Sequence, residues 1–87
     1  MHIYFVFTSR ARALRAERAL LQRGFDAAAV PTPQQAGLSC ELSVRCITNS
    51  RAREAYRIIK AAGLADGIRA CFIKNGKSFK RQECSLL

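Results

Sequence analysis

The stretch HIYFVFTSRARALRAERALLQRG, residues 2–24, decides the fold class because a strand pattern passes directly into a helix pattern. Its first part, residues 2–8, is rich in β-branched and aromatic residues, which is typical of a central, buried strand. Thr8 or Ser9 can cap a following helix, and Gly24 can adopt the left-handed conformation that ends one. The stretch therefore predicts a β-strand followed by an α-helix.

The expected helix, residues 10–23, has an apolar face that contains one carboxylate. The residues on this face are Ala13, Leu14, Glu17, Leu20 and Leu21. A carboxylate in such a face is costly unless it is paired or lies at the edge of the face. Two interpretations of Glu17 stay open. It lies at the sheet margin or pairs with an arginine such as Arg45, or it orients the loop that carries Cys40.

Three further strands are expected, at residues 25–30, 41–48 and 67–74. A second helix lies before the last of them, with Asn49 or Ser50 as its cap. The residues that form its buried stripe are Ala52, Ala55, Ile58, Ile59 and Ala62. This helix is expected to end at the following glycine, Gly63.

The element order is strand, helix, strand, strand, helix, strand. With right-handed crossovers, this order predicts an α+β domain, a ferredoxin-like βαββαβ sandwich. Its four-stranded antiparallel sheet is covered on one face by two helices. We assign residues 1–74 to this domain. Asn75-Gly76 is a hairpin-type turn signal, and residues 75–87 form a basic C-terminal tail that is either an edge strand or disordered.

Composition limits the function classes. The chain has 87 residues, enough for one small core. No apolar run approaches the roughly 20 residues of a membrane helix, and the start does not resemble a signal peptide, so we expect a cytoplasmic protein that does not enter membranes. The net charge of +9 predicts weak binding to polyanions, although the basic residues are spread along the whole chain. Composition leaves open whether the protein is a monomer or a small homo-oligomer.

The chain has four cysteines, Cys40, Cys46, Cys71 and Cys84, without a C-x-x-C pair, and its one histidine is His2. In a reducing compartment these cysteines are free thiols. We therefore predict no metal site and no cofactor. Alternation places Cys46 in the core, leaves the face of Cys71 unresolved, and puts Cys84 in the accessible tail.

Residues 31–40, PTPQQAGLSC, are the strongest candidate for a functional loop. Pro31 and Pro33 stop ladder pairing and hold the chain extended, and Cys40 lies where the loop re-enters the sheet. No histidine is close in sequence, which argues against a Cys-His hydrolase. A thiol without a general base suits thiol exchange or the carrying of a sulfur-family atom. The alternative is that Cys40 is a small, packed residue at the start of a strand.

Three segments together resemble the selenium/sulfur (Se/S) carrier-like family of small bacterial proteins: ALRAERALL at residues 13–21, Pro31-Thr32-Pro33, and Leu38-Ser39-Cys40. The resemblance spans about residues 3–74. It implies a carrier rather than an enzyme. In such a carrier, Cys40 accepts sulfur or selenium from a donor protein and passes it to an acceptor protein.

The resemblance also implies roles for the neighbours of Cys40. Pro31, Thr32, Pro33 and Ser39 shape the loop, and Glu17 orients it. Family members have arginine and glycine where this chain has Gln34 and Glu41. A carboxylate next to the thiol raises the pKa of that thiol.

Two other functions are compatible with the residues. The first is an RNA-binding module that stacks bases on aromatic residues of the open sheet face, such as those of Tyr4-Phe5-Val6-Phe7 and Phe72. The sequence pattern typical of such modules is absent. The second is a plain protein-interaction domain in which Cys40 is inert.

Overall fold

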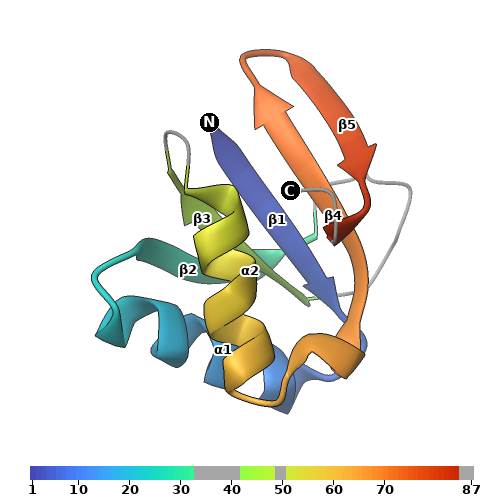
Figure 1. Cartoon of the computed structure of the whole chain (residues 1–87). Helices are drawn as coiled ribbons and strands as arrows, with labels where there is room; N and C mark the ends of the chain where they lie inside the picture. Colours follow the sequence, from blue (N-terminus) through green and yellow to red (C-terminus); the bar gives the residue numbers. More distant parts are fainter. Residues whose placement is uncertain (33–41, 49–50, 85–87) are drawn as a thin grey trace.

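The computed structural model describes residues 1–32, 42–48 and 51–84 of the chain. Two α-helices, a short 3₁₀-helix and the strands of one sheet make up these residues (Figure 1). In chain order the elements are β1 (His2–Phe7), α1 (Arg10–Gln22), β2 (Asp26–Pro31), β3 (Leu42–Ile47), α2 (Ala52–Ala61), the 3₁₀-helix (Ala65–Gly67), β4 (Ile68–Asn75) and β5 (Ser78–Gln82). Neither α-helix is long and apolar enough to cross a membrane.

The sheet has five strands in the order β2-β3-β1-β4-β5, and every neighbouring pair is antiparallel. The α+β class and the antiparallel sheet are confirmed, but the expected number of four strands is wrong. The fifth strand, β5, lies in the basic tail and pairs with β4 after a turn at Asn75-Gly76. Gly76 has a φ of 58°, the left-handed region that a tight hairpin requires.

Both helices lie on the same side of the sheet (Figure 1). Ile3, Phe5 and Phe7 of β1 point toward the helices and are essentially inaccessible to solvent. The alternate residues Tyr4 and Val6 point to the opposite face, where they form a second apolar cluster. Both faces of β1 are therefore buried, which explains why its sequence is apolar without interruption.

The residues that end α1 on either side, Ser9 and Gly24, are among those predicted from the sequence. The Ser9 hydroxyl caps the helix by accepting a hydrogen bond from the N–H of Arg12 at 3.3 Å. Gly24 follows the helix with a φ of 83°, and its N–H donates to the carbonyl of Leu21. A residue with a side chain is strained in this conformation, so glycine is the natural terminator.

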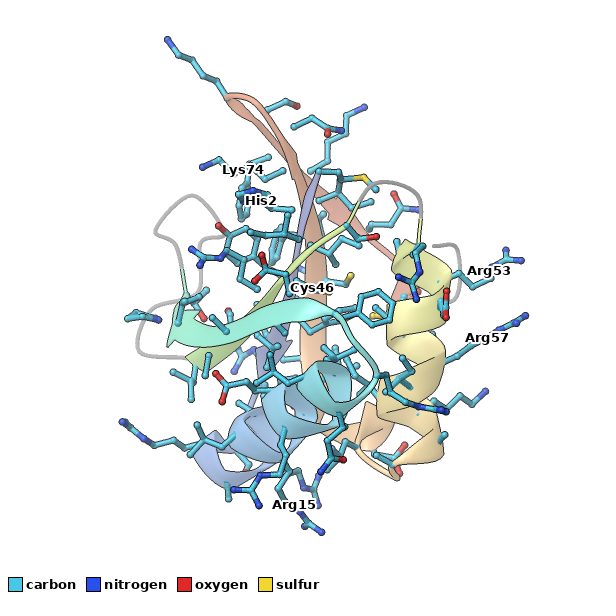
Figure 2. All side chains as sticks on the ribbon, turned by 90° about the vertical axis from the view of Figure 1, so that its left-hand side faces the viewer. His2, Arg15, Cys46, Arg53, Arg57 and Lys74 are labelled. Carbon is cyan, nitrogen blue, oxygen red and sulfur yellow. The ribbon has the colours of Figure 1, made fainter. Side chains whose placement is uncertain are left out.

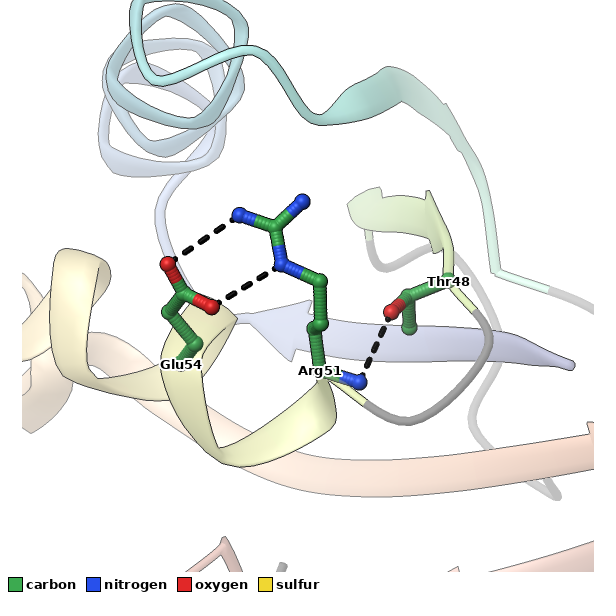
Figure 3. A network of polar contacts seen from close by, with 3 residues as sticks. All are labelled: Thr48, Arg51 and Glu54. Atoms are coloured by element: carbon green, nitrogen blue, oxygen red, sulfur yellow. Dashed lines mark hydrogen bonds and ion pairs between the residues drawn. The ribbon is translucent and has the colours of Figure 1, made fainter.

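The start of α2 differs from the prediction. The helix begins at Ala52 with Arg51 as its N-cap residue, while the expected caps, Asn49 and Ser50, lie outside the described residues. The Thr48 hydroxyl accepts a hydrogen bond from the Arg51 N–H at 3.0 Å (Figure 3). Thr48, the residue directly after β3, thus holds the backbone of the N-cap residue Arg51.

The buried helix faces are narrower than expected. In α1, Leu14 and Leu21 are 47% and 51% exposed, whereas Ala16 is buried. In α2, Ile58 is half-buried and Ala62 is exposed. Small side chains at the contact let the helices approach the sheet closely, so only one narrow row of each helix is covered. The residues of these rows are Ala13, Ala16 and Leu20 in α1, and Ala52, Ala55 and Ile59 in α2.

Candidate functional site

The segment 33–41 begins and ends at adjacent strand ends. Pro31, the last residue of β2, pairs with Leu42, the first residue of β3. We expected the ladder to stop before Pro31, and this was wrong. Because β2 is an edge strand, a proline whose nitrogen faces away from β3 removes no ladder hydrogen bond. We call residues 29–32 and 42–43 the loop stem.

A hydroxyl pair closes the loop stem beyond the last ladder pair. Thr32 Oγ1 and Ser43 Oγ lie 2.6 Å apart, and the Ser43 side chain is completely buried. A buried hydroxyl needs such a partner, because leaving it unpaired costs free energy. The bond therefore fixes Thr32, one of the expected loop-shaping residues, to β3.

Glu17 connects α1 to the loop stem. Its Oε2 atom accepts a hydrogen bond from the backbone N–H of Ala29 at 2.6 Å. Ala29 lies on the edge strand β2, where outward N–H groups have no strand partner. Glu17 is thus at the sheet margin, one of the positions expected for it. Arg45, the suggested ion-pair partner, pairs in register with Tyr4 and therefore lies on the sheet face opposite α1.

The structure describes three of the predicted site residues, Glu17, Pro31 and Thr32. Glu17 binds the backbone of β2 from the helix side, whereas the Thr32 hydroxyl meets Ser43 on the opposite face of the sheet. Pro33, Ser39 and Cys40 lie outside the described residues, as do Gln34 and Glu41. In the sequence, Cys40 precedes Leu42 of the loop stem by two residues. The roles predicted for these residues remain predictions. Ser43 was missed, because nothing local indicates that its hydroxyl meets that of Thr32.

The other cysteines occupy different environments. Cys46 is completely buried, as predicted, and burial raises the pKa of its thiol to about 11, with a smaller contribution from Asp26. Cys71 points to the helix side of the sheet and is also buried. Cys84 was expected to be accessible, but it is half-buried and packs against the core cluster that contains Cys71. Across residues 1–32, 42–48 and 51–84, no three His, Cys, Asp or Glu side chains are grouped to hold a metal ion.

The sheet face opposite the helices carries aromatic rings that pack on one another. The centroid of Phe79 lies 5.1 Å from that of Phe72 and 5.5 Å from that of Tyr4. Tyr4 and Phe72 are only 6% and 5% exposed. Base stacking on an RNA-binding sheet needs open ring faces. These rings are therefore packed as a second small core and offer little surface to a base.

Positive charge is distributed over the outside of the molecule. Figure 2 shows Arg15 extending from α1, and Arg53 and Arg57 extending from α2, all away from the core, while Cys46 lies inside. His2 and Lys74 lie together at another part of the surface (Figure 2). The pKa of His2 is lowered by desolvation and then by the positive charges of the N-terminus, Arg45 and Lys74, against an opposing effect of Asp26. This distribution produces a general positive field rather than a single basic site.

The comparisons with known proteins agree with the resemblance in the sequence. A family model described as "Putative Se/S carrier protein-like" matches residues 2–68, which include α1, the loop stem and the whole of residues 31–40. Searches of curated proteins and of solved structures find no significant match. The match covers most of the chain and leaves out Cys71 and Cys84. The chain therefore belongs to the Se/S carrier-like family.

Proposed function

We propose that this protein is a non-enzymatic carrier that holds a sulfur or selenium atom on Cys40 and passes it between a donor and an acceptor protein in the cytoplasm. The observation that carries the proposal is the family match, which includes the Pro-Thr-Pro and Ser-Cys segments at residues 31–33 and 39–40. The proposal requires no metal and no cofactor, because the transferred atom travels on a thiol.

The transfer step is a thiol exchange. The thiolate of Cys40 attacks the terminal sulfur of a persulfide on the donor, so that a new S–S bond forms on Cys40 and the donor leaves as a thiolate. The acceptor thiolate then attacks the terminal sulfur on Cys40 in the same manner. No net oxidation occurs in either step. A selenium atom in place of the terminal sulfur follows the same path.

The loop stem supports this proposal. Functional residues are often carried by loops whose ends are held by a rigid scaffold. Here the ends are held by the Pro31–Leu42 ladder pair and the Thr32–Ser43 hydroxyl bond. Glu17 anchors the strand that leads into the loop. In the proposal, Pro31, Thr32, Pro33 and Ser39 shape the loop, Glu17 orients it, and the basic surface attracts an acidic donor or acceptor.

We also infer that residues 1–74 form a ferredoxin-like unit. The order of its elements and the spatial order β2-β3-β1-β4 support this assignment. In this interpretation β5 is an extra strand added at the edge of β4. The loop stem, on β2 and β3, then lies at the end of the strand order that is farthest from β5.

Mass spectrometry after incubation with a cysteine desulfurase and cysteine tests the proposal. We expect one added sulfur on Cys40 in the wild-type protein and its loss in Cys40→Ser. Cys46→Ser is the matched control, because this buried thiol is expected to take no part. Persulfide at equal yield on Cys40→Ser protein, or on another cysteine of the wild-type protein, contradicts the proposal.

A further inference from the structure

A second cysteine site lies at the other end of the sheet. A pocket of about 490 Å³ opens beside β4 and the end of β5, and both Cys71 and Cys84 line it. This volume is within the range of pockets that bind small molecules. Neither cysteine lies in the region that matches the Se/S carrier-like family. The role proposed for Cys40 therefore does not account for this pair.

The two thiols interact with each other. Cys71 is in the middle of β4 and pairs in register with Gln82 of β5, and Cys84 follows two residues later in the chain. The Cys84 side chain packs against the buried cluster that contains Cys71, and their mutual interaction shifts the pKa of both thiols. Cys71 is 1% exposed and Cys84 is half-buried. A reagent in the pocket therefore reaches Cys84 first, with Cys71 directly behind it.

The interaction with Cys71 favours a thiolate on Cys84. This interaction lowers the pKa of Cys84, against the opposing effects of desolvation and Glu83. The same interaction, followed by burial, raises the pKa of Cys71. Among the described residues, Arg69, Arg81 and Glu83 also line the pocket, beside the general positive field of a chain with a net charge of +9. Such a lining attracts an anionic ligand.

We propose that Cys84 and Cys71 form a redox-active dithiol that an anionic low-molecular-weight disulfide, bound in this pocket, oxidises to an intramolecular disulfide. The Cys84 thiolate attacks one sulfur of the small disulfide, forms a mixed disulfide and releases one small thiolate. Cys71 then loses its proton to solvent and attacks the Cys84 sulfur, which releases the second small thiolate. Two protein thiols are oxidised and one small disulfide is reduced.

The geometry suits closure of the protein disulfide. A protein disulfide has an S–S bond of about 2.05 Å and Cα atoms usually about 4.4–6.8 Å apart. Cys84 is on the short segment after β5, whereas Cys71 is fixed in β4 between two strands. Closure therefore calls for movement of Cys84 rather than of Cys71. The step uses neither Cys40 nor the loop stem, so it does not depend on the proposed carrier function.

The test uses the reduced full-length chain and glutathione disulfide, followed by intact-mass measurement and peptide mapping. We expect the wild-type protein and Cys46→Ser to lose two hydrogens and to gain a Cys71–Cys84 disulfide. Cys71→Ser is expected to stop as a mixed disulfide with glutathione on Cys84, and Cys84→Ser is expected to leave Cys71 unreacted. A wild-type disulfide that joins another pair, or a failure to form one under oxidising glutathione ratios, overturns the proposal.

Three further measurements leave the buried Cys71 unchanged. On the folded wild-type protein, iodoacetamide is expected to label Cys84 before Cys71, and the reverse order contradicts the assignment of Cys84 as the attacking thiol. The cationic disulfide cystamine is expected to react more slowly than glutathione disulfide. Arg81→Gln is expected to slow the glutathione reaction about threefold, as a partly screened surface charge allows. Equal rates for the two disulfides contradict the anionic specificity.

Discussion

Glu17 of α1 accepts a hydrogen bond from the backbone N–H of Ala29 on β2 at 2.6 Å, two residues before the strand ends at Pro31. A helix side chain therefore satisfies a main-chain donor of an edge strand. The contact joins two elements that adjoin in sequence, and it explains why the apolar face of α1 contains a carboxylate. We therefore expect removal of the Glu17 carboxylate to destabilise the loop stem.

Replacing Glu17 should destabilise the protein. Glu17→Ala removes a charged acceptor and should lower the free energy of unfolding by about 1.5–3 kcal/mol, while Glu17→Gln keeps an acceptor and should lower it less. Urea unfolding followed by circular dichroism measures both variants. If Glu17→Ala is as stable as the wild type, the hydrogen bond to Ala29 contributes nothing. Slower persulfide formation on Cys40 in folded Glu17→Gln would further support the orienting role.

The Thr32–Ser43 pair should behave as a coupled unit. Thr32→Val leaves the buried Ser43 hydroxyl without its partner and should cost about 1–3 kcal/mol. Adding Ser43→Ala removes the unpaired group, so the double variant should lose less than the sum of the two single variants. A double-mutant cycle by chemical denaturation measures the coupling. Strict additivity of the two losses would show that the hydroxyls act independently.

Ionisation of the Cys46 thiol should make the free energy of unfolding depend on pH in the alkaline range. Desolvation raises the pKa of its thiol from 9.0 to about 11, so the folded state holds this proton more tightly than the unfolded state. The resulting stabilisation is complete below pH 9 and is lost as the pH rises toward about 11. The stability difference between wild type and Cys46→Ala should therefore decrease over this range. A difference that stays constant with pH would contradict the raised pKa.

Arg51 makes two contacts that should contribute differently to stability, one with Thr48 and one with Glu54 (Figure 3). Thr48→Val removes the acceptor for the Arg51 N–H and should cost about 1 kcal/mol, as is typical of one lost hydrogen bond. Glu54→Gln weakens an ion pair of 2.9 Å that is open to solvent on both sides, and it should change stability little. Thermal unfolding of both variants makes the comparison. An equal or larger loss in Glu54→Gln would reverse this ranking.

Features determined by neighbouring residues were predictable from the sequence. Ser9, Gly24 and the Asn75-Gly76 turn act through local backbone chemistry, and the structure uses each of them as expected. The alternation of β3 likewise placed Cys46 in the core. Each of these signals involves only a few neighbouring residues, so it can be recognised without knowledge of the fold.

Features that depend on tertiary contacts were not predictable. Helical periodicity alone favoured Leu14 and Leu21 over Ala16 as core residues, but close approach of α1 to the sheet selects the smaller side chain. The sequence left open whether residues 75–87 form an edge strand or are disordered, because pairing with β4 rather than local propensity decides that β5 forms. The meeting of Cys71 and Cys84 follows from that pairing, so it was missed as well.

The composition of β2 also has a consequence for self-association. A free sheet edge is a template on which a second chain can add a strand. On β2 the outward donor of Ala29 is already engaged by Glu17, and at the next outward position Pro31 has no donor to offer. An incoming strand therefore lacks two successive backbone N–H donors on β2 to which it could hydrogen-bond. The loop stem thus protects this margin of the sheet against aggregation.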